Sequence, residues 1–175
     1  MNPLIILFGL MLVSPLWAQT MHQGHAAHVH GEARLNLAWS GVELLIELES
    51  PAINLLGFEH AIQSAQDRQR LQQVVSTLKQ GAASLITPNA QAGCSIAQVD
   101  VDSALMDDAA GDTQHADFDV AISYRCEAID ALHSIDSSGL FKVFPGLQQI
   151  EAQWISDRSQ GARELDAQRP VISLP

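Results

Sequence analysis

The sequence has 175 residues, of which 47% are hydrophobic and 5% aromatic, and nine Lys and Arg against 20 Asp and Glu give a formal net charge of -11. This length suits one domain with a hydrophobic core. The shortage of aromatic residues and the lack of a basic cluster argue against nucleic acid or an anionic membrane surface as a partner. Cations are the ligands that such an acidic chain favours.

Residues 1–18 are predicted to be a secretory signal peptide. The apolar run over 4–13 is too short to cross a bilayer, and the segment ends at Ala18, after which cleavage is expected. No Cys lies near this position, so no membrane anchor is expected after cleavage. The mature chain would begin at Gln19 and fold in an oxidising compartment.

Export to an oxidising compartment predicts that the two cysteines form a disulfide. Cys94 and Cys126 are interpreted as one disulfide. It would close a loop of about thirty residues and contribute roughly 3 kcal/mol in the chain-entropy description. The alternative is a pair of soft metal ligands, which their wide separation disfavours.

The mature sequence divides into a polar, histidine-rich arm over 19–32 and a single α+β metal-binding domain over 33–175. Alternating apolar residues on both sides of Ser40-Gly41 predict a β-hairpin. If Ser40 and Gly41 form a two-residue turn, Leu37 lies opposite Leu44.

Helix-capping residues and further alternation predict the rest of the domain. Ser64 and Asp67 form a Ser-x-x-Asp variant of the capping box, which predicts a helix over 65–80 that ends at Gly81. The predicted fold is α+β, mainly antiparallel β-sheet with about two helices and one disulfide. The remaining predictions are an ordered loop over 50–63, strands over 94–101, 118–126 and 149–155, a last strand ending at Ile172, a short helix over 129–141 and a mobile acidic segment near 102–117.

The candidate chemistry lies in the histidines, because the sequence carries no catalytic motif, and no enzymatic activity is expected. Neutral imidazole is a preferred ligand for Zn²⁺, with copper and nickel as less favoured alternatives here. The alternative for the arm is a solvated segment whose histidines have no role. Four histidines fall within nine residues of the arm: His22, His25, His28 and His30.

The expected hairpin register adds two carboxylates to this site. It sets Glu32 opposite Glu49, and the same face continues to His30. Like charges directly opposite destabilise a sheet, whereas the same groups around a divalent cation are favourable. The alternative is that the strands splay there and water screens the two charges.

Two other histidines need a separate interpretation. His115 shares one side of a strand with Asp117 and Asp119, which allows a second, weaker cation site, although a solvated charged face is the simpler reading. His60 stands alone in its loop, and by itself indicates a structural residue.

Several motifs from His28 to the C-terminus occur together. They are His28-Val-His30-Gly, the stretch Ser50-Pro-Ala-Ile-Asn-Leu-Leu-Gly-Phe-Glu-His60, a Cys at 94, a second Cys after Tyr124-Arg125, and Phe144-Pro145. This combination resembles the ZrgA-like family of zinc-regulated periplasmic zinc-binding proteins. The resemblance implies zinc binding in the periplasm, help to a high-affinity zinc ABC importer, and His28, His30 and His60 as zinc ligands.

The sequence departs from that family in one region. Members carry a long His/Asp/Glu-rich loop between the two cysteines, whereas this chain has there a single histidine, His115. Zinc binding is therefore expected to rest more on the N-terminal arm. The favoured function is a periplasmic zinc buffer or delivery protein. The alternative is a disulfide-stapled envelope module for protein interaction, with incidental metal affinity.

Overall fold

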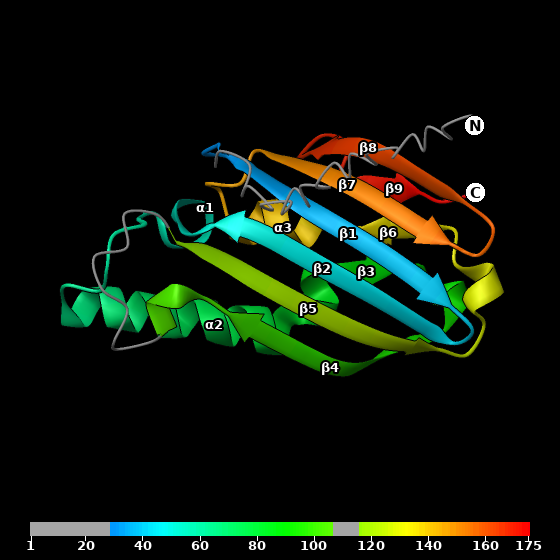
Figure 1. Ribbon diagram of the computed structural model, residues 1–175, viewed down its shortest axis with the longest axis horizontal. Helices are drawn as coiled ribbons and strands as arrows, with labels where there is room; N and C mark the ends of the chain where they lie inside the picture. The colour runs from blue at the N-terminus through cyan, green and yellow to red at the C-terminus, as the bar shows by residue number, and fades with distance from the viewer. Residues whose placement is uncertain (1–28, 107–115) are drawn as a thin grey trace, which may run out of the picture.

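The computed structural model describes residues 29–106 and 116–175. Its main element is a six-stranded sheet in the order β4-β5-β2-β1-β7-β8 (Figure 1), in which β1 and β7 are parallel and the other neighbouring strands are antiparallel. This confirms the predicted α+β class with a mainly antiparallel sheet. The strands are β1 (Glu32–Ser40), β2 (Glu43–Pro51), β4 (Cys94–Asp102), β5 (Asp117–Cys126), β7 (Gln149–Ser156) and β8 (Gln160–Asp166).

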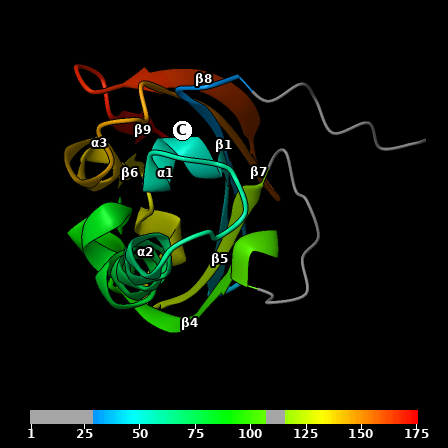
Figure 2. The same cartoon turned by 90° about the vertical axis from the view of Figure 1, so that its left-hand side faces the viewer.

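Three helices and a small three-stranded sheet lie together on one side of the main sheet (Figure 2). We call that side the covered face, and we call the opposite side, which carries the side chains of Arg34, Asn36 and Ala38 from β1, the open face. The covering elements are α1 (Ala52–Leu56), α2 (Ala65–Leu85), α3 (Ser138–Val143), β3 (Thr87–Pro88), β6 (Ser134–Asp136) and β9 (Val171–Ser173). Separately, three short 3-10 turns lie in the connections, at Ala90–Ala92, Ala104–Met106 and Ile129–Ala131.

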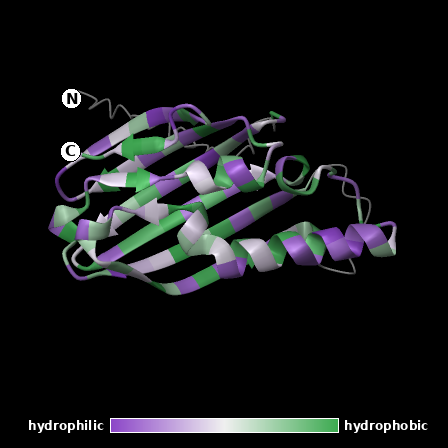
Figure 3. Cartoon of the chain, turned by 180° about the vertical axis from the view of Figure 1, so that it is seen from behind, coloured by the Kyte–Doolittle hydropathy of each residue, from purple (hydrophilic) through white to green (hydrophobic). Residues whose placement is uncertain are grey.

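The core forms between the covered face and α2. On β1 and β2 every second residue is buried, as the alternation predicts. Helix α2 meets them with one apolar stripe and turns its polar residues outward (Figure 3). The residues of this stripe are Leu71, Val74, Leu78, Ala82 and Leu85.

Helix α2 starts where it was predicted and ends later. Ser64 and Asp67 form the full capping box, with the Ser64 side chain accepting from Asp67 N–H and the Asp67 carboxylate accepting from Ser64 N–H. The predicted stop at Gly81 is wrong, because the helix continues to Leu85. Glycine inside a helix costs about 1 kcal/mol, and burial of Ala82 and Leu85 more than offsets it.

The hairpin is present, but its predicted register is wrong by two residues. The turn residues are Gly41 and Val42, and Ser40 pairs with Glu43. Leu37 therefore faces Ile46 instead of Leu44. A shift of two residues keeps every side chain on its face of the sheet, so the apolar pattern fits both registers equally well.

Other differences from the sequence predictions concern short elements. The segment 50–63 is not all loop, because β2 continues to Pro51 and α1 follows. The helix predicted over 129–141 is wrong: a 3-10 turn, strand β6 and helix α3 occupy this stretch and the residues just beyond it. Strands β3 and β8 were not predicted. The Cys94–Cys126 disulfide is confirmed, and it joins directly paired residues of β4 and β5.

Three predictions fall wholly or partly outside the residues that the structure describes. They are the signal peptide over 1–18, most of the arm over 19–32, and the centre of the acidic segment near 102–117. The ends of that acidic segment belong to regular elements, since Asp102 closes β4 and Asp117 opens β5. Within 29–106 and 116–175, no helix has the length and hydrophobicity needed to cross a membrane.

Candidate metal centre

One end of the main sheet brings together the residues that flank β1 and those that follow β2 (Figure 1). Asn54 of α1, which is 3% exposed, makes the connection. Its Oδ1 accepts from the N–H of Gly31 at 2.7 Å, and its Nδ2 donates to the carbonyl of Glu32 at 2.8 Å and to Ser50 Oγ at 3.2 Å. The start of β1 is therefore fixed to α1 through a single buried amide.

This attachment carries His30 to the loop that follows α1. His30 Nε2 lies 3.2 Å from Glu59 Oε2, and the two side chains are 60% and 21% exposed. A carboxylate can only accept, so His30 donates through Nε2 and its Nδ1 carries the lone pair when the ring is neutral. The pair is accessible to an ion from solvent.

His60 comes next in the same loop and has a defined ring orientation. Its ring stacks on Phe58, with centroids 4.7 Å apart and an interplanar angle of 18°. His60 Nδ1 lies 2.8 Å from the carbonyl oxygen of Ala61. A carbonyl accepts, so Nδ1 holds the proton and Nε2 is left as a free donor atom for a metal. Backbone carbonyls commonly orient metal-binding histidines in this way.

The loop that carries Glu59 and His60 is anchored at both ends. Gly57 closes α1 with φ 86°, a left-handed conformation that favours glycine, and its N–H donates to Ile53 O at 3.0 Å. Arg70 of α2 donates from Nη2 to Leu55 O at 3.1 Å. The capping box of α2 holds the other end of the loop. The side chains of Glu59 and His60 thus project from a short, well-anchored connection between two helices.

His60 also lies close enough to the capping box of α2 to influence the Asp67 carboxyl. Partial burial raises the pKa of the Asp67 carboxyl, but hydrogen bonds from the N–H groups of Gln63 and Ser64 and the nearby His60 lower it, and the net pKa is below its ordinary value. Asp67 is consequently a carboxylate near His60 at neutral pH, which adds negative potential around the imidazole.

The predicted site residues have different outcomes. The structure brings His30 to the Glu59 carboxylate, and His60 is the residue that follows Glu59 in the same loop. Glu32 and Glu49 do not face each other, because Glu49 pairs with Arg34, whose Nη1 lies 3.8 Å from Glu49 Oε2. The like-charge pairing that suggested them as ligands is therefore wrong. His22, His25, His28 and His115 lie outside the described residues.

Glu59 was missed as a candidate ligand by sequence reasoning. The signal for it was its place next to His60 at the end of the Ser50–His60 motif. Among the described residues, no three His, Cys, Asp or Glu side chains are grouped closely enough to hold a metal ion without rearrangement. His30, Glu59 and His60 offer two imidazole nitrogens and a carboxylate, which are the ligand types that Zn²⁺ takes in proteins.

Comparison with known protein families assigns the chain to one of them. Residues 27–174 match the family described as ZrgA family zinc uptake protein. The chain belongs to this family, as the motifs in its sequence indicated, and its role is related to zinc uptake. No curated protein matches the chain.

Proposed function

We propose that this protein binds zinc in the periplasm and buffers it or delivers it to a high-affinity zinc import system. Membership of a zinc uptake family supports the zinc-related part of this proposal. The disulfide between Cys94 and Cys126 agrees with an oxidising compartment. The apolar residues at 1–18 agree with export through a signal peptide.

The contact of His30 with Glu59, the neighbour of His60 in the chain, is the observation that carries the proposal. His30 Nε2 and Glu59 Oε2 lie 3.2 Å apart in a position exposed to solvent. A zinc ion that enters here would bind Nε2 of His30 and the Glu59 carboxylate if the ring proton of His30 moves from Nε2 to Nδ1. A rearrangement of the loop side chains would add Nε2 of His60. The exposure suits a protein that must acquire and release zinc.

The histidine-rich arm supplies further ligands in this proposal. His28 is two residues before His30, and His25 and His22 precede His28 at three-residue intervals. Structural zinc sites usually have four ligands. Arm histidines would therefore complete the coordination that His30, Glu59 and His60 begin.

Isothermal titration calorimetry of the disulfide-bonded chain 19–175 with zinc tests this site. We expect His60→Ala and His30→Ala each to weaken zinc binding by at least about tenfold, which corresponds to about 1.4 kcal/mol. His133→Ala is the matched control, because His133 is also exposed and its Nδ1 lies 3.0 Å from the carbonyl of Ala131. Unchanged affinity in all three variants would show that the ligands lie elsewhere.

Delivery needs a separate test. The zinc-loaded protein is mixed with the metal-free periplasmic binding component of a zinc ABC importer, and zinc transfer is followed over time. Direct delivery predicts transfer faster than zinc loss to an excess of chelator. Equal rates would limit the role to buffering.

A further inference from the structure

The described part of the chain before β1 forms a tight turn. The N–H of Glu32 donates to the carbonyl of Val29 at 3.0 Å, and Gly31 has φ 90°. This is the pattern of a β-turn with glycine in its third position, and such a turn reverses the chain. A chain that continued in the direction set by this turn would run back along β1.

The space around β1 restricts where this segment can run. β1 is paired on one edge with β2 and on the other edge with β7, so no additional strand can join it. On its covered face, Leu35 and Leu37 are 0% and 2% exposed and packed in the core. The open face is the side of β1 that the described elements leave accessible, with Asn36 and Ala38 exposed on it.

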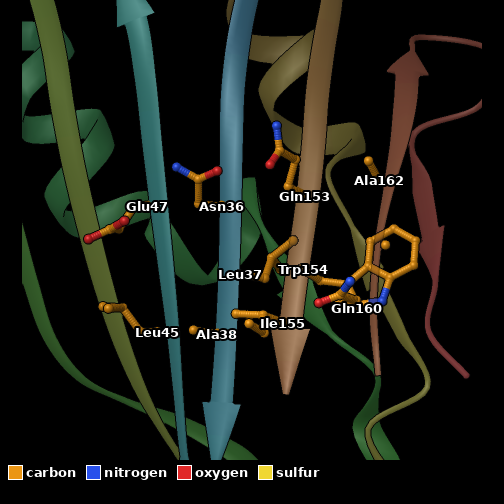
Figure 4. Close-up of a pocket in the computed structure, with 11 residues that line it drawn as sticks. Asn36, Leu37, Ala38, Leu45, Glu47, Gln153, Trp154, Ile155, Gln160 and Ala162 are labelled. Carbon is orange, nitrogen blue, oxygen red and sulfur yellow. The ribbon is translucent and has the colours of Figure 1, made fainter. Parts of the chain in front are cut away.

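The open face has two neighbouring hollows, of about 690 and 420 Å³, and Asn36 and Glu47 line both. The larger one has an apolar floor with Leu45 and Ile155, which are 37% and 56% exposed, on either side of Ala38 (Figure 4). Exposed apolar side chains that lie side by side across three strands are typical of a surface that another segment covers.

Carboxylates gather on the open face toward the start of β1. One row across the sheet runs through directly paired residues of all six strands, and the next row adds two more carboxylates and no basic residue. Arg34 is the basic residue of the first row, and Lys79 of α2 also lines the smaller hollow. The carboxylates of the first row are Asp102, Asp119, Glu49, Glu151 and Glu164, and those of the second are Asp100 and Glu47.

We propose that segment 19–28, when it carries zinc, folds back over the open face along β1. This inference rests on the proposed zinc binding by the arm. Ten residues span at most about 33 Å when extended, which matches the roughly 30 Å of the nine residues of β1. The neutral histidines of the arm with Zn²⁺ would form a cationic segment, which complements the carboxylates. Met21, the largest apolar side chain of this segment, is available to the hollow.

Covalent attachment makes this docking favourable even if each contact is weak. A segment joined directly to β1 has an effective concentration in the millimolar range at the open face. A separate basic protein would have to compete with it for the same carboxylates. The arm and the folded domain would then hold zinc together and would not act as independent chelators.

Nuclear magnetic resonance of the full mature chain 19–175, with its disulfide, tests this proposal with zinc as the probe. We expect zinc to shift the amide signals of Asn36, Ala38 and Glu47. In the His22→Gln/His25→Gln/His28→Gln variant these shifts should disappear, while signals near His30 and His60 still respond. Zinc-dependent shifts confined to His30, Glu59 and His60 would overturn the docking and leave the proposed function intact. A spectrum without any zinc-dependent shift would contradict the proposed function itself.

Charge variants give a second, independent measurement. We expect Glu47→Gln with Glu49→Gln to weaken zinc binding about tenfold. Glu43→Gln is the matched control, because Glu43 lies on the same strand at its opposite end and is exposed. Urea denaturation confirms that each variant is folded. Wild-type affinity in the double variant would overturn the docking.

Discussion

The imidazole of His30 and the carboxylate of Glu59 meet at 3.2 Å although 29 residues separate them in the sequence. Their contact depends on Asn54, which ties the residues after His30 to the helix before Glu59. The site is therefore assembled by a buried amide that touches neither side chain. Changes at this junction should affect both the stability of the domain and its zinc affinity.

Asn54→Ala should lower the free energy of unfolding by about 2–4 kcal/mol. It leaves the N–H of Gly31 and the carbonyl of Glu32 without their present partner in a poorly hydrated position, at about 1–3 kcal/mol each. Urea denaturation measures the loss. Asn36→Ala, on the exposed side of β1, is the control and should stay within about 0.5 kcal/mol of wild type. Equal stability of the two variants would contradict this role of Asn54.

Gly146→Ala should also destabilise the junction, by about 1–3 kcal/mol. A Cβ at this position would lie 2.7 Å from the carbonyl oxygen of Asn54, which is backbone and cannot move freely. Gly81→Ala should have the opposite sign, because its Cβ would meet no atom closer than Leu85 Cγ at 4.0 Å and alanine favours the helix by up to about 1 kcal/mol. Thermal unfolding of the two variants measures this contrast. A stabilising Gly146→Ala would show that the loop is loosely packed.

Removal of the disulfide by Cys94→Ala with Cys126→Ala should lower the free energy of unfolding by about 3–4 kcal/mol. The cysteines are 32 residues apart, and the crosslink restricts the unfolded chain over that length. Chemical denaturation with and without reductant is the measurement. Reduction of the wild-type protein should reproduce the effect of the double variant, and a much smaller loss in both would mean that residual structure restricts the unfolded chain.

Acid should weaken the fold partly through Asp67. The pKa of its carboxyl is lowered in the folded state, so the stabilisation is complete above the ordinary value of 3.8 and is lost as the pH falls toward the folded-state pKa. Unfolding measured between pH 5 and pH 2.5 should therefore show a weaker pH dependence in Asp67→Asn than in wild type. Parallel curves would mean that the capping carboxylate does not contribute to acid sensitivity.

Zinc binding should decrease by at least about tenfold between pH 7 and pH 5.5. Imidazole must be neutral to bind a metal, and protons compete with zinc over this range. Calorimetry at several pH values measures the slope, which should be shallower in His60→Ala because one competing imidazole is missing. A flat profile in the wild type would indicate ligands that are mainly carboxylates.

Zinc should also raise the melting temperature, because binding to the folded state stabilises it.

The sequence by itself determined the features that depend on residues close together in the chain or on composition alone. The alternation of Leu35 and Leu37 with Arg34 and Asn36 predicted the faces of β1, because one side of a strand is buried here. The capping box at Ser64 is a contact between residues three apart, so it can be read directly. With two cysteines in the chain, the expected disulfide had a single possible pairing. The family motifs at His28–Gly31 and Ser50–His60 indicated the zinc-related class.

The tertiary structure decided the register of the hairpin and the composition of the site. Leu37 can face Leu44 or Ile46 with equal burial, and the choice follows from the turn at Gly41-Val42 together with pairing to β5 and β7. Glu59 becomes a partner of His30 only after Asn54 joins α1 to the start of β1. Contacts between residues far apart in the chain depend on the summed packing of several elements, and the local pattern around each residue does not contain that information.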